Sequence, residues 1–182
     1  MNIIDLPLKG LKLVELKVHG DSRGFFVERF NSKLFEEGGL PTHFAQDNHS
    51  RSAPDVLRGV HFQFDPPQGK LVGCVRGSIW DVAVDLRVGS PTFGQNYSVE
   101  LSDTNGKLLW IPAGFGHGFC VTSDAGADVY YKVDRLYNPK GELGINWNDP
   151  ELSIPWPVKN PAVSARDAAL MSFADYKKKP VF

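Results

Sequence analysis

Short stretches of apolar and β-branched residues, separated by Gly, Pro, Asn and Asp, run along most of the chain. Stretches of this length with turn residues at both ends are typical of β-strands. The predicted strands are Leu11–Val18, Gly24–Phe30, Val56–Gln63, Lys70–Arg76, Ser78–Arg87, Gln95–Leu101, Lys107–Ile111, Gly118–Thr122 and Val129–Val133. Many short strands indicate an all-β sandwich or barrel.

Helical signals are few. Ser32 can cap a short helix that carries Leu34–Glu36 and ends before two glycines, and Ser164 can cap another that carries Asp167–Met171. We therefore expect a few short helices beside a β scaffold.

The stretch Val56–Gln63 combines strand-forming residues with groups that carry chemistry. Because side chains alternate across a strand, His61 and Gln63 are expected on one face and Arg58 on the other. A lone histidine in a strand is more often a hydrogen-bonded core residue than a functional one. The cation Lys70 shortly afterwards favours a functional site.

Composition bounds the class of protein. The 182 residues are 42% hydrophobic and 12% aromatic, which is enough for one well-developed core, so we expect a single domain over residues 1–182. The net charge of −1 and the lack of a long basic run argue against a nucleic-acid partner or an anionic membrane surface.

The location of the protein follows from further absences in the sequence. No apolar stretch reaches membrane-spanning length, and Met1–Leu16 has no signal-peptide core. Cys74 and Cys120 have no metal-binding spacing and are most simply buried, reduced thiols. We expect a soluble, cytoplasmic protein.

The segment Gly59–Gly77 resembles the first signature of the cupin jelly roll, in which a His-x-His pair binds a metal. Here Gln63 replaces the second histidine, and Lys70 stands near the position of the expected carboxylate. His61 and His117 alone make a poor ligand set. The sequence therefore predicts a cupin-type jelly roll without a metal or other cofactor, in which an imidazole with an ordinary pKa of about 6.5 can transfer protons.

A set of longer motifs extends from about Gly20 to Asp167. They are Gly20–Glu28, Gln46–Ser50, Val56–Gln63, Gly69–Val72, Asp81–Arg87, Ser90–Gly94, Trp110–Phe119, Trp147–Pro150 and Trp156–Pro157. In this order they resemble the dTDP-4-dehydrorhamnose 3,5-epimerases of deoxysugar biosynthesis. The resemblance implies a role in dTDP-rhamnose biosynthesis, which supplies cell-surface polysaccharide. So many ordered matches are far more specific than any one of them.

The resemblance implies a metal-independent isomerase that inverts C3 and C5 of dTDP-4-dehydro-6-deoxy-D-glucose. The C4 ketone acidifies the hydrogens on both carbons, so the reaction needs a base, a group that stabilises the enolate, and an acid on the opposite face. By resemblance His61 is the base, Asp167 orients it, Tyr131 is the acid and Lys70 is the cation near the enolate. Family members form homodimers whose sites draw on the neighbouring subunit.

The resemblance also assigns contacts to the nucleotide sugar. These are the cations Arg23, Arg58 and Arg166 and the further contacts Phe25, Glu28, Gln46, Asp47, Asn48, His117 and Glu142. Arginine suits a diphosphate because its planar fork donates two parallel hydrogen bonds.

Other interpretations of these residues stay open on the sequence alone. Asp167 can simply favour the first turn of a helix, and His117 can be structural. Strand alternation does not say which of Tyr130 and Tyr131 faces a site. For the pair Phe25 and Phe26, alternation predicts that one ring is buried in the core.

Two positions depart from the family pattern. Arg166 stands where lysine is common, and Leu136 replaces the first of two adjacent tyrosines, so the alternative function is inversion of only one carbon, C3 or C5. Two further hypotheses are a metal-dependent cupin that uses His61 and His117, and a sugar-nucleotide binder without catalysis.

Overall fold

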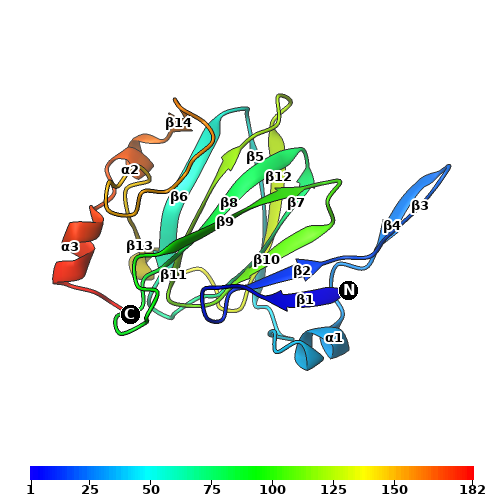
Figure 1. Ribbon diagram of the computed structural model, residues 1–182, viewed down its shortest axis with the longest axis horizontal. Coiled ribbons are helices and arrows are strands. Elements are labelled where there is room, and N and C mark those ends of the chain that lie inside the picture. The colour runs from blue at the N-terminus through cyan, green and yellow to red at the C-terminus, as the bar shows by residue number, and fades with distance from the viewer.

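Two β-sheets face each other in the computed structural model, which describes all residues 1–182 (Figure 1). The first sheet contains, in spatial order, β1 (Asn2–Asp5), β2 (Lys12–Glu15), β10 (Lys107–Ile111), β7 (Lys70–Arg76), β12 (Ala127–Val133) and β5 (Gln46–Ser52). The second contains β13 (Glu142–Gly144), β6 (Val56–Gln63), β11 (Phe115–Val121), β8 (Ser78–Asp85) and β9 (Asn96–Ser102), with β14 (Ala162–Val163) paired to β6. The predicted β-sandwich is confirmed.

The remaining elements lie outside these sheets. They are a hairpin of β3 (Val18–Asp21) and β4 (Gly24–Val27), the helices α1 (Ser32–Glu37), α2 (Ala165–Ala168) and α3 (Phe173–Lys178), and a 3-10 turn, η1 (Pro139–Gly141). Asn31, and not Ser32, caps α1, because its side chain accepts a hydrogen bond from the Leu34 N–H. Ser164 caps α2 as predicted, but this helix ends at Ala168, before Met171.

The main core fills one end of the space between the sheets. It contains Val72, Leu109 and Val129 from the first sheet and Ile79 and Val121 from the second, all nearly inaccessible to solvent. Two smaller apolar clusters cover the outer faces, one under α3 and one under α1. Burial of apolar side chains on both faces holds the sheets together and leaves the other end of the interior for polar groups.

Most predicted strands are present within a few residues, and β6, β7 and β10 have the predicted bounds. The prediction of one strand over Leu11–Val18 is wrong, because the chain leaves the first sheet after Glu15 and enters the hairpin at Val18. The strand β5 was not predicted. Its sequence, Gln46–Ser52, has polar residues on both faces, so it lacks the apolar alternation that marks a strand.

A bulge in β6 changes which residues share a face. His61 pairs with His117 and Arg58 with Phe119, so β6 has one more residue than β11 between the two pairs. An extra residue reverses the alternation of side chains. Arg58 and His61 consequently line the same cavity, and the prediction that they lie on opposite faces is wrong.

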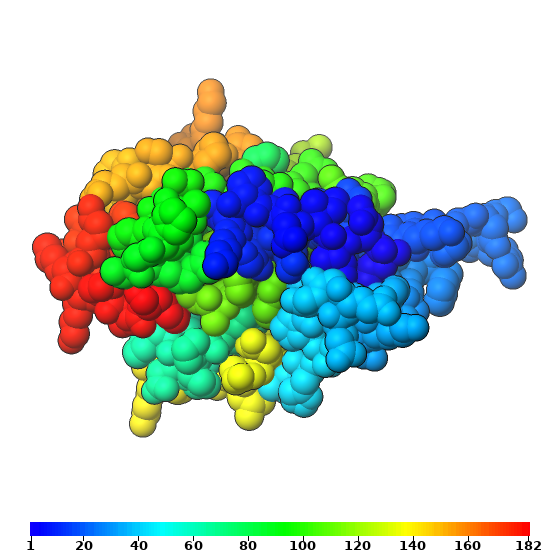
Figure 2. All heavy atoms as spheres, turned by 60° about the horizontal axis from the view of Figure 1, so that its bottom comes forward, coloured from blue at the N-terminus to red at the C-terminus, as the bar shows by residue number.

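The β3–β4 hairpin projects from the body of the molecule, as both Figure 1 and Figure 2 show. Phe25 is 67% exposed and Phe26 70%, and the neighbouring Val18 is also exposed. The prediction that one of the two phenylalanines is buried in the core is wrong, because neither face of this hairpin packs on a sheet. No helix of this structure is long and apolar enough to cross a membrane.

Glycine at the bulge is required by a close approach of two strands. Gly59 has φ +125°, and a Cβ there would lie 2.5 Å from the Cα of Gly118. We expect Gly59→Ala to lower the free energy of unfolding by about 2 kcal/mol more than Gly89→Ala, because overpacking is added to the backbone cost. Gly89 also has positive φ, +86°, but open space around it. Thermal unfolding of both variants measures the difference, and equal melting temperatures would contradict it.

Candidate active site

A cavity of about 670 Å³ opens between the two sheets at the end that the apolar core leaves free. The structure brings most of the predicted site residues to its walls. These are His61, Lys70, Tyr131, Asp167, Gln46, Asn48, Arg58, His117, Glu142 and Arg166. The cavity therefore collects residues from both sheets and from the segment near the C-terminus.

His61 and Asp167 form the central contact of the cavity. Nε2 of His61 donates to Oδ1 of Asp167 at 2.8 Å, and their side chains are only 23% and 7% exposed. Burial lowers the pKa of His61 below its ordinary value, while the Asp167 carboxylate opposes this by stabilising the imidazolium. With Nε2 held by the carboxylate, Nδ1 is the nitrogen that can accept a proton at neutral pH.

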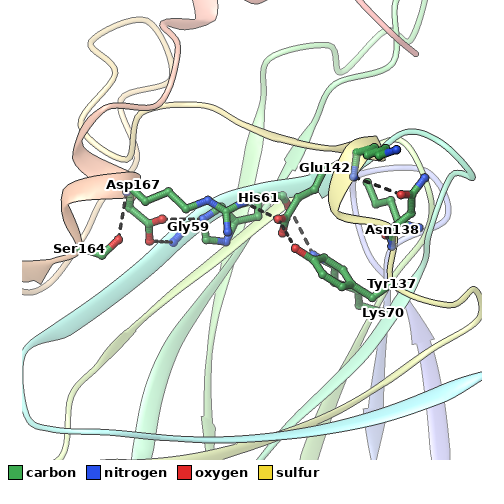
Figure 3. Close-up of polar contacts among 11 residues, drawn as sticks. Gly59, His61, Lys70, Tyr137, Asn138, Glu142, Ser164 and Asp167 are labelled. Atoms are coloured by element: carbon green, nitrogen blue, oxygen red, sulfur yellow. Dashed lines mark hydrogen bonds and ion pairs between the residues drawn. The ribbon is translucent and has the colours of Figure 1, made fainter.

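The other contacts of Asp167 hold its carboxylate in place. Oδ2 accepts from the backbone N–H of Gly59 at 3.1 Å, so one carboxylate joins two residues of the bulged strand. The backbone N–H of Asp167 donates to the Ser164 hydroxyl, which caps α2 (Figure 3). The helix cap and the bulge together fix the orientation of the His61 ring.

Lys70 enters the cavity from β7, on the sheet opposite His61. Its ammonium donates to the backbone carbonyl of His61 at 3.4 Å. Burial lowers the pKa of Lys70 to about 8, although Glu142 and Asp81 favour the charged form. The side chain is therefore mainly a cation at neutral pH, close to the strand that carries His61.

A second histidine–carboxylate pair lies deeper in the second sheet. Nε2 of His117 bonds Oδ2 of Asp81 at 2.9 Å, and both residues are buried. Burial raises the pKa of Asp81, with His117 and Lys70 acting in the opposite direction. His117 thus lines the cavity with one ring nitrogen already engaged.

Tyr131, and not Tyr130, faces the cavity. On β12 the side chain of Tyr130 points to the outer face, where its hydroxyl donates to Asp47. Burial raises the pKa of Tyr131, and the negative charge of Glu142 adds to the effect. The phenol is therefore protonated at neutral pH and can act as a proton donor.

Polar side chains of β5 line the wall next to Tyr131. Gln46, Asn48 and Ser50 alternate with outward-facing residues, and the amide of Gln46 donates to Asn48. Arg58 reaches across from β6, and its Nε donates to the Ser52 hydroxyl at 3.0 Å. This side of the cavity can donate several hydrogen bonds to a polar ligand.

Four predicted contacts do not lie at this cavity. Arg23 and Phe25 line a separate hollow on the projecting hairpin, and Arg23 pairs with Asp21. Glu28 is exposed and accepts from Asn31. Asp47 is on the outer face of the first sheet, because it alternates with Gln46 and Asn48.

The residues at or behind the cavity that the sequence did not assign to the site include Ser50, Tyr137 and Asp81. Ser50 and Tyr137 line its wall, and Asp81 supports His117 from behind. Alternation within Gln46–Ser50 could have indicated Ser50, whereas Asp81 needed the pairing of β8 with β11. No group of three or more His, Cys, Asp or Glu side chains is placed to hold a metal ion.

Comparison with known proteins gives the family. A sequence profile of the dTDP-4-dehydrorhamnose 3,5-epimerases matches residues 5–175. The chain belongs to this family. It is 50% identical over 177 residues to the dTDP-4-dehydrorhamnose 3,5-epimerase of Shigella flexneri, covering 96% of this chain and 97% of the relative.

Two further similar proteins bear on the substrate and the outcome of the family's reaction. The crystal structure of the Legionella pneumophila 3,5-epimerase in complex with dTDP-4-keto-L-rhamnose has a TM-score of 0.91 and 48% identity, over 95% of this chain and 93% of that one. The dTDP-4-dehydrorhamnose 3-epimerase of Streptomyces niveus is 40% identical over 177 residues, 96% of this chain and 85% of the relative. The predicted family and its cupin-type sandwich are confirmed.

The contact between His61 and Asp167 can be tested directly. We expect Asp167→Asn to lower the pKa of His61 further, because the variant removes the charge that stabilises the imidazolium. Nitrogen NMR of the histidine ring across a pH titration measures this pKa. Asp175→Asn, which removes a surface carboxylate paired with Lys178, should leave it unchanged. An unchanged His61 pKa in Asp167→Asn would contradict the assigned contact.

Proposed function

We propose that this member of the family inverts C3 and C5 of dTDP-4-dehydro-6-deoxy-D-glucose and so forms dTDP-4-dehydro-L-rhamnose, with His61 as base and Tyr131 as acid. One observation carries the assignment of roles. His61 extends into the cavity from β6 of the second sheet, and Tyr131 from β12 of the first. A sugar ring between the sheets therefore meets a base on one face and an acid on the other, as inversion requires.

Each inversion is a proton removal followed by a proton return. Nδ1 of His61 takes a proton from the carbon beside the C4 ketone. The electron pair of the broken C–H bond moves towards the ketone oxygen, which forms an enolate. The Lys70 ammonium stabilises this oxygen, because opposite charges attract more strongly beside a buried group such as Lys70 than in bulk water. As the Tyr131 hydroxyl delivers a proton to the opposite face of the carbon, the electrons of the enolate form the C4 ketone again. The Tyr131 phenolate then takes a proton from solvent, and the His61 imidazolium releases its proton to solvent, which restores both groups.

The change at Leu136 does not remove a hydroxyl from the cavity. The Leu136 side chain is 65% exposed, and its carbonyl accepts from the Gln63 amide. Tyr137 lines the cavity, and its hydroxyl donates to Glu142 at 2.9 Å. This arrangement supports inversion of both carbons rather than one. We further propose that the reaction proceeds without a metal, in the cytoplasm, with residues 1–182 acting as one catalytic domain.

Proton NMR of the substrate in deuterated water tests the function. We expect the protein to exchange the C3 and C5 hydrogens with deuterium from the solvent. In His61→Ala, the rate of exchange at both carbons should fall by at least about 10²-fold, while dTDP still binds. Tyr131→Phe should retain some exchange, because the base still removes the proton. His43→Ala, at an exposed histidine outside the cavity, is the matched control.

The outcomes of this experiment are distinct. Exchange at one carbon only would make the protein a single-carbon epimerase. Exchange at neither carbon by the unaltered protein would refute the proposed function, and full activity of His61→Ala would refute the mechanism.

We also propose that two copies of the chain pair and that the β3–β4 hairpin of each completes the cavity of the other. The hairpin carries two predicted substrate contacts, Arg23 and Phe25, and a third, Glu28, follows it directly, yet none of them lies at the cavity of its own chain. Exposed Phe25 and Phe26 at the end of a projecting arm are typical of a surface that a partner covers. A second copy supplies that partner with the usual two-fold symmetry.

Mixing two inactive variants tests this pairing. His61→Ala lacks the base, and Arg23→Glu alters only the hairpin, so in a mixed dimer one site combines an intact base with an intact hairpin. We expect subunit exchange in an equal mixture to restore about a quarter of the sites. No recovery, although mass analysis detects mixed dimers, would show that each hairpin serves its own chain.

A further inference from the structure

One of the predicted diphosphate ligands, Arg166, is already paired with the carboxylate of Glu142, which lines the cavity. Glu142 begins β13, and its Oε2 accepts hydrogen bonds from the Tyr137 hydroxyl and from Nη2 of Arg166. The Glu142 side chain is only 15% exposed, whereas that of Arg166 is 59% exposed. The guanidinium expected to bind phosphate is therefore paired with a carboxylate of the same chain.

The two partners differ in how easily they can move. Glu142 is fixed by the pairing of β13 with β6, where it lies opposite Gln63. Arg166 stands in α2, beside the immobilised Asp167, but its side chain is long and 59% exposed, and its Nη2 donates to Glu142. A rotation of the Arg166 side chain alone can transfer the guanidinium from the carboxylate to a ligand, without any movement of the backbone.

The charge of Glu142 also acts on the groups proposed for catalysis. Burial disfavours its ionised form, but the hydrogen bonds from Arg166 and Tyr137 outweigh burial and keep its pKa below the ordinary value. This carboxylate favours the charged forms of His61 and Lys70 and the neutral form of Tyr131. In Figure 3, Glu142 and Tyr137 lie on one side of His61, and Asp167 lies on the other.

We propose that Glu142 is a positioning residue that exchanges its arginine with the substrate: the diphosphate of the nucleotide sugar competes with Glu142 for Arg166, and its binding leaves the Glu142 charge free to act on His61 and Lys70. This inference rests on the proposed function and extends it. An arginine can pair with a carboxylate or a phosphate through the same fork of donors, so the two anions are direct competitors. Release of Arg166 increases the effective negative charge beside the base at the moment when the substrate is in place.

Calorimetric titration with dTDP distinguishes competition from a direct contact. If Glu142 competes for Arg166, Glu142→Gln binds dTDP about fivefold more tightly, because the variant keeps the shape and a hydrogen-bond acceptor for Tyr137 but loses the competing charge. Arg166→Gln weakens binding. In the Arg166→Gln background, the additional change Glu142→Gln alters affinity by less than about twofold.

Turnover provides a second readout. Glu142→Gln should lower kcat together with KM, because it removes the charge that supports His61 while strengthening binding of the diphosphate. If Glu142 had only a structural role, kcat and KM would not fall together in this way. Glu151→Gln, which removes a surface carboxylate paired with Lys177, is the matched control and should change neither dTDP affinity nor turnover.

Each other outcome has its own meaning. Weaker dTDP binding by Glu142→Gln would overturn the inference and make Glu142 a direct substrate contact. If Glu142→Gln strengthened dTDP binding equally with and without Arg166, the inference would also be overturned. The change in affinity would then come from the loss of negative charge in general and not from competition for Arg166. Failure of the unaltered protein to bind dTDP would refute the proposed function itself, and normal binding without tightening in Glu142→Gln would refute only the exchange of Arg166.

Discussion

The carboxylate of Asp167 joins two parts of the chain that are 106 residues apart, and the geometry of the candidate active site depends on that junction. One oxygen binds His61 and the other binds the backbone of Gly59, so the bulge in β6 and the helix cap at Ser164 are parts of a single support. Burial of a carboxylate is costly unless hydrogen bonds compensate for its lost hydration, and both oxygens of Asp167 have such partners. The same contacts that satisfy Asp167 therefore orient the imidazole.

The position of the cavity follows from a division of the interior into apolar and polar ends. Inward-facing residues of β7 change from Cys74 and Val72 in the core to Lys70 in the cavity, and those of β12 change from Val129 to Tyr131. Each strand thus contributes apolar side chains to the core along one part of its length and polar side chains to the cavity along the other. A rigid core next to the cavity fixes the side chains that line it more precisely than loops could.

Burial and charge in this cavity oppose each other in a way that suits proton transfer. Desolvation lowers the pKa of His61, which favours the neutral imidazole, and lowers the pKa of Lys70 to about 8. Nearby carboxylates act in the opposite direction on both pKa values. The negative charges of Asp167, Asp81 and Glu142 are distributed around these two groups, each with its own hydrogen-bond donors. This balance provides a neutral base and a cation in the same cavity at the same pH.

The sequence by itself determined the β class, the family and most of the residues at the cavity. Short apolar and β-branched stretches between turn residues identified β6, β7 and β10, and the ordered motifs identified His61, Tyr131 and Asp167 through resemblance. Only the tertiary structure decided which residues share a face at the bulge, where β5 lies, and that the hairpin with Arg23 and Phe25 stands away from its own cavity. The reason is that a bulge depends on the pairing of two distant strands, and a polar strand such as β5 carries no apolar period. Likewise, the pairing of Arg166 with Glu142 arises from the approach of segments that no local pattern relates.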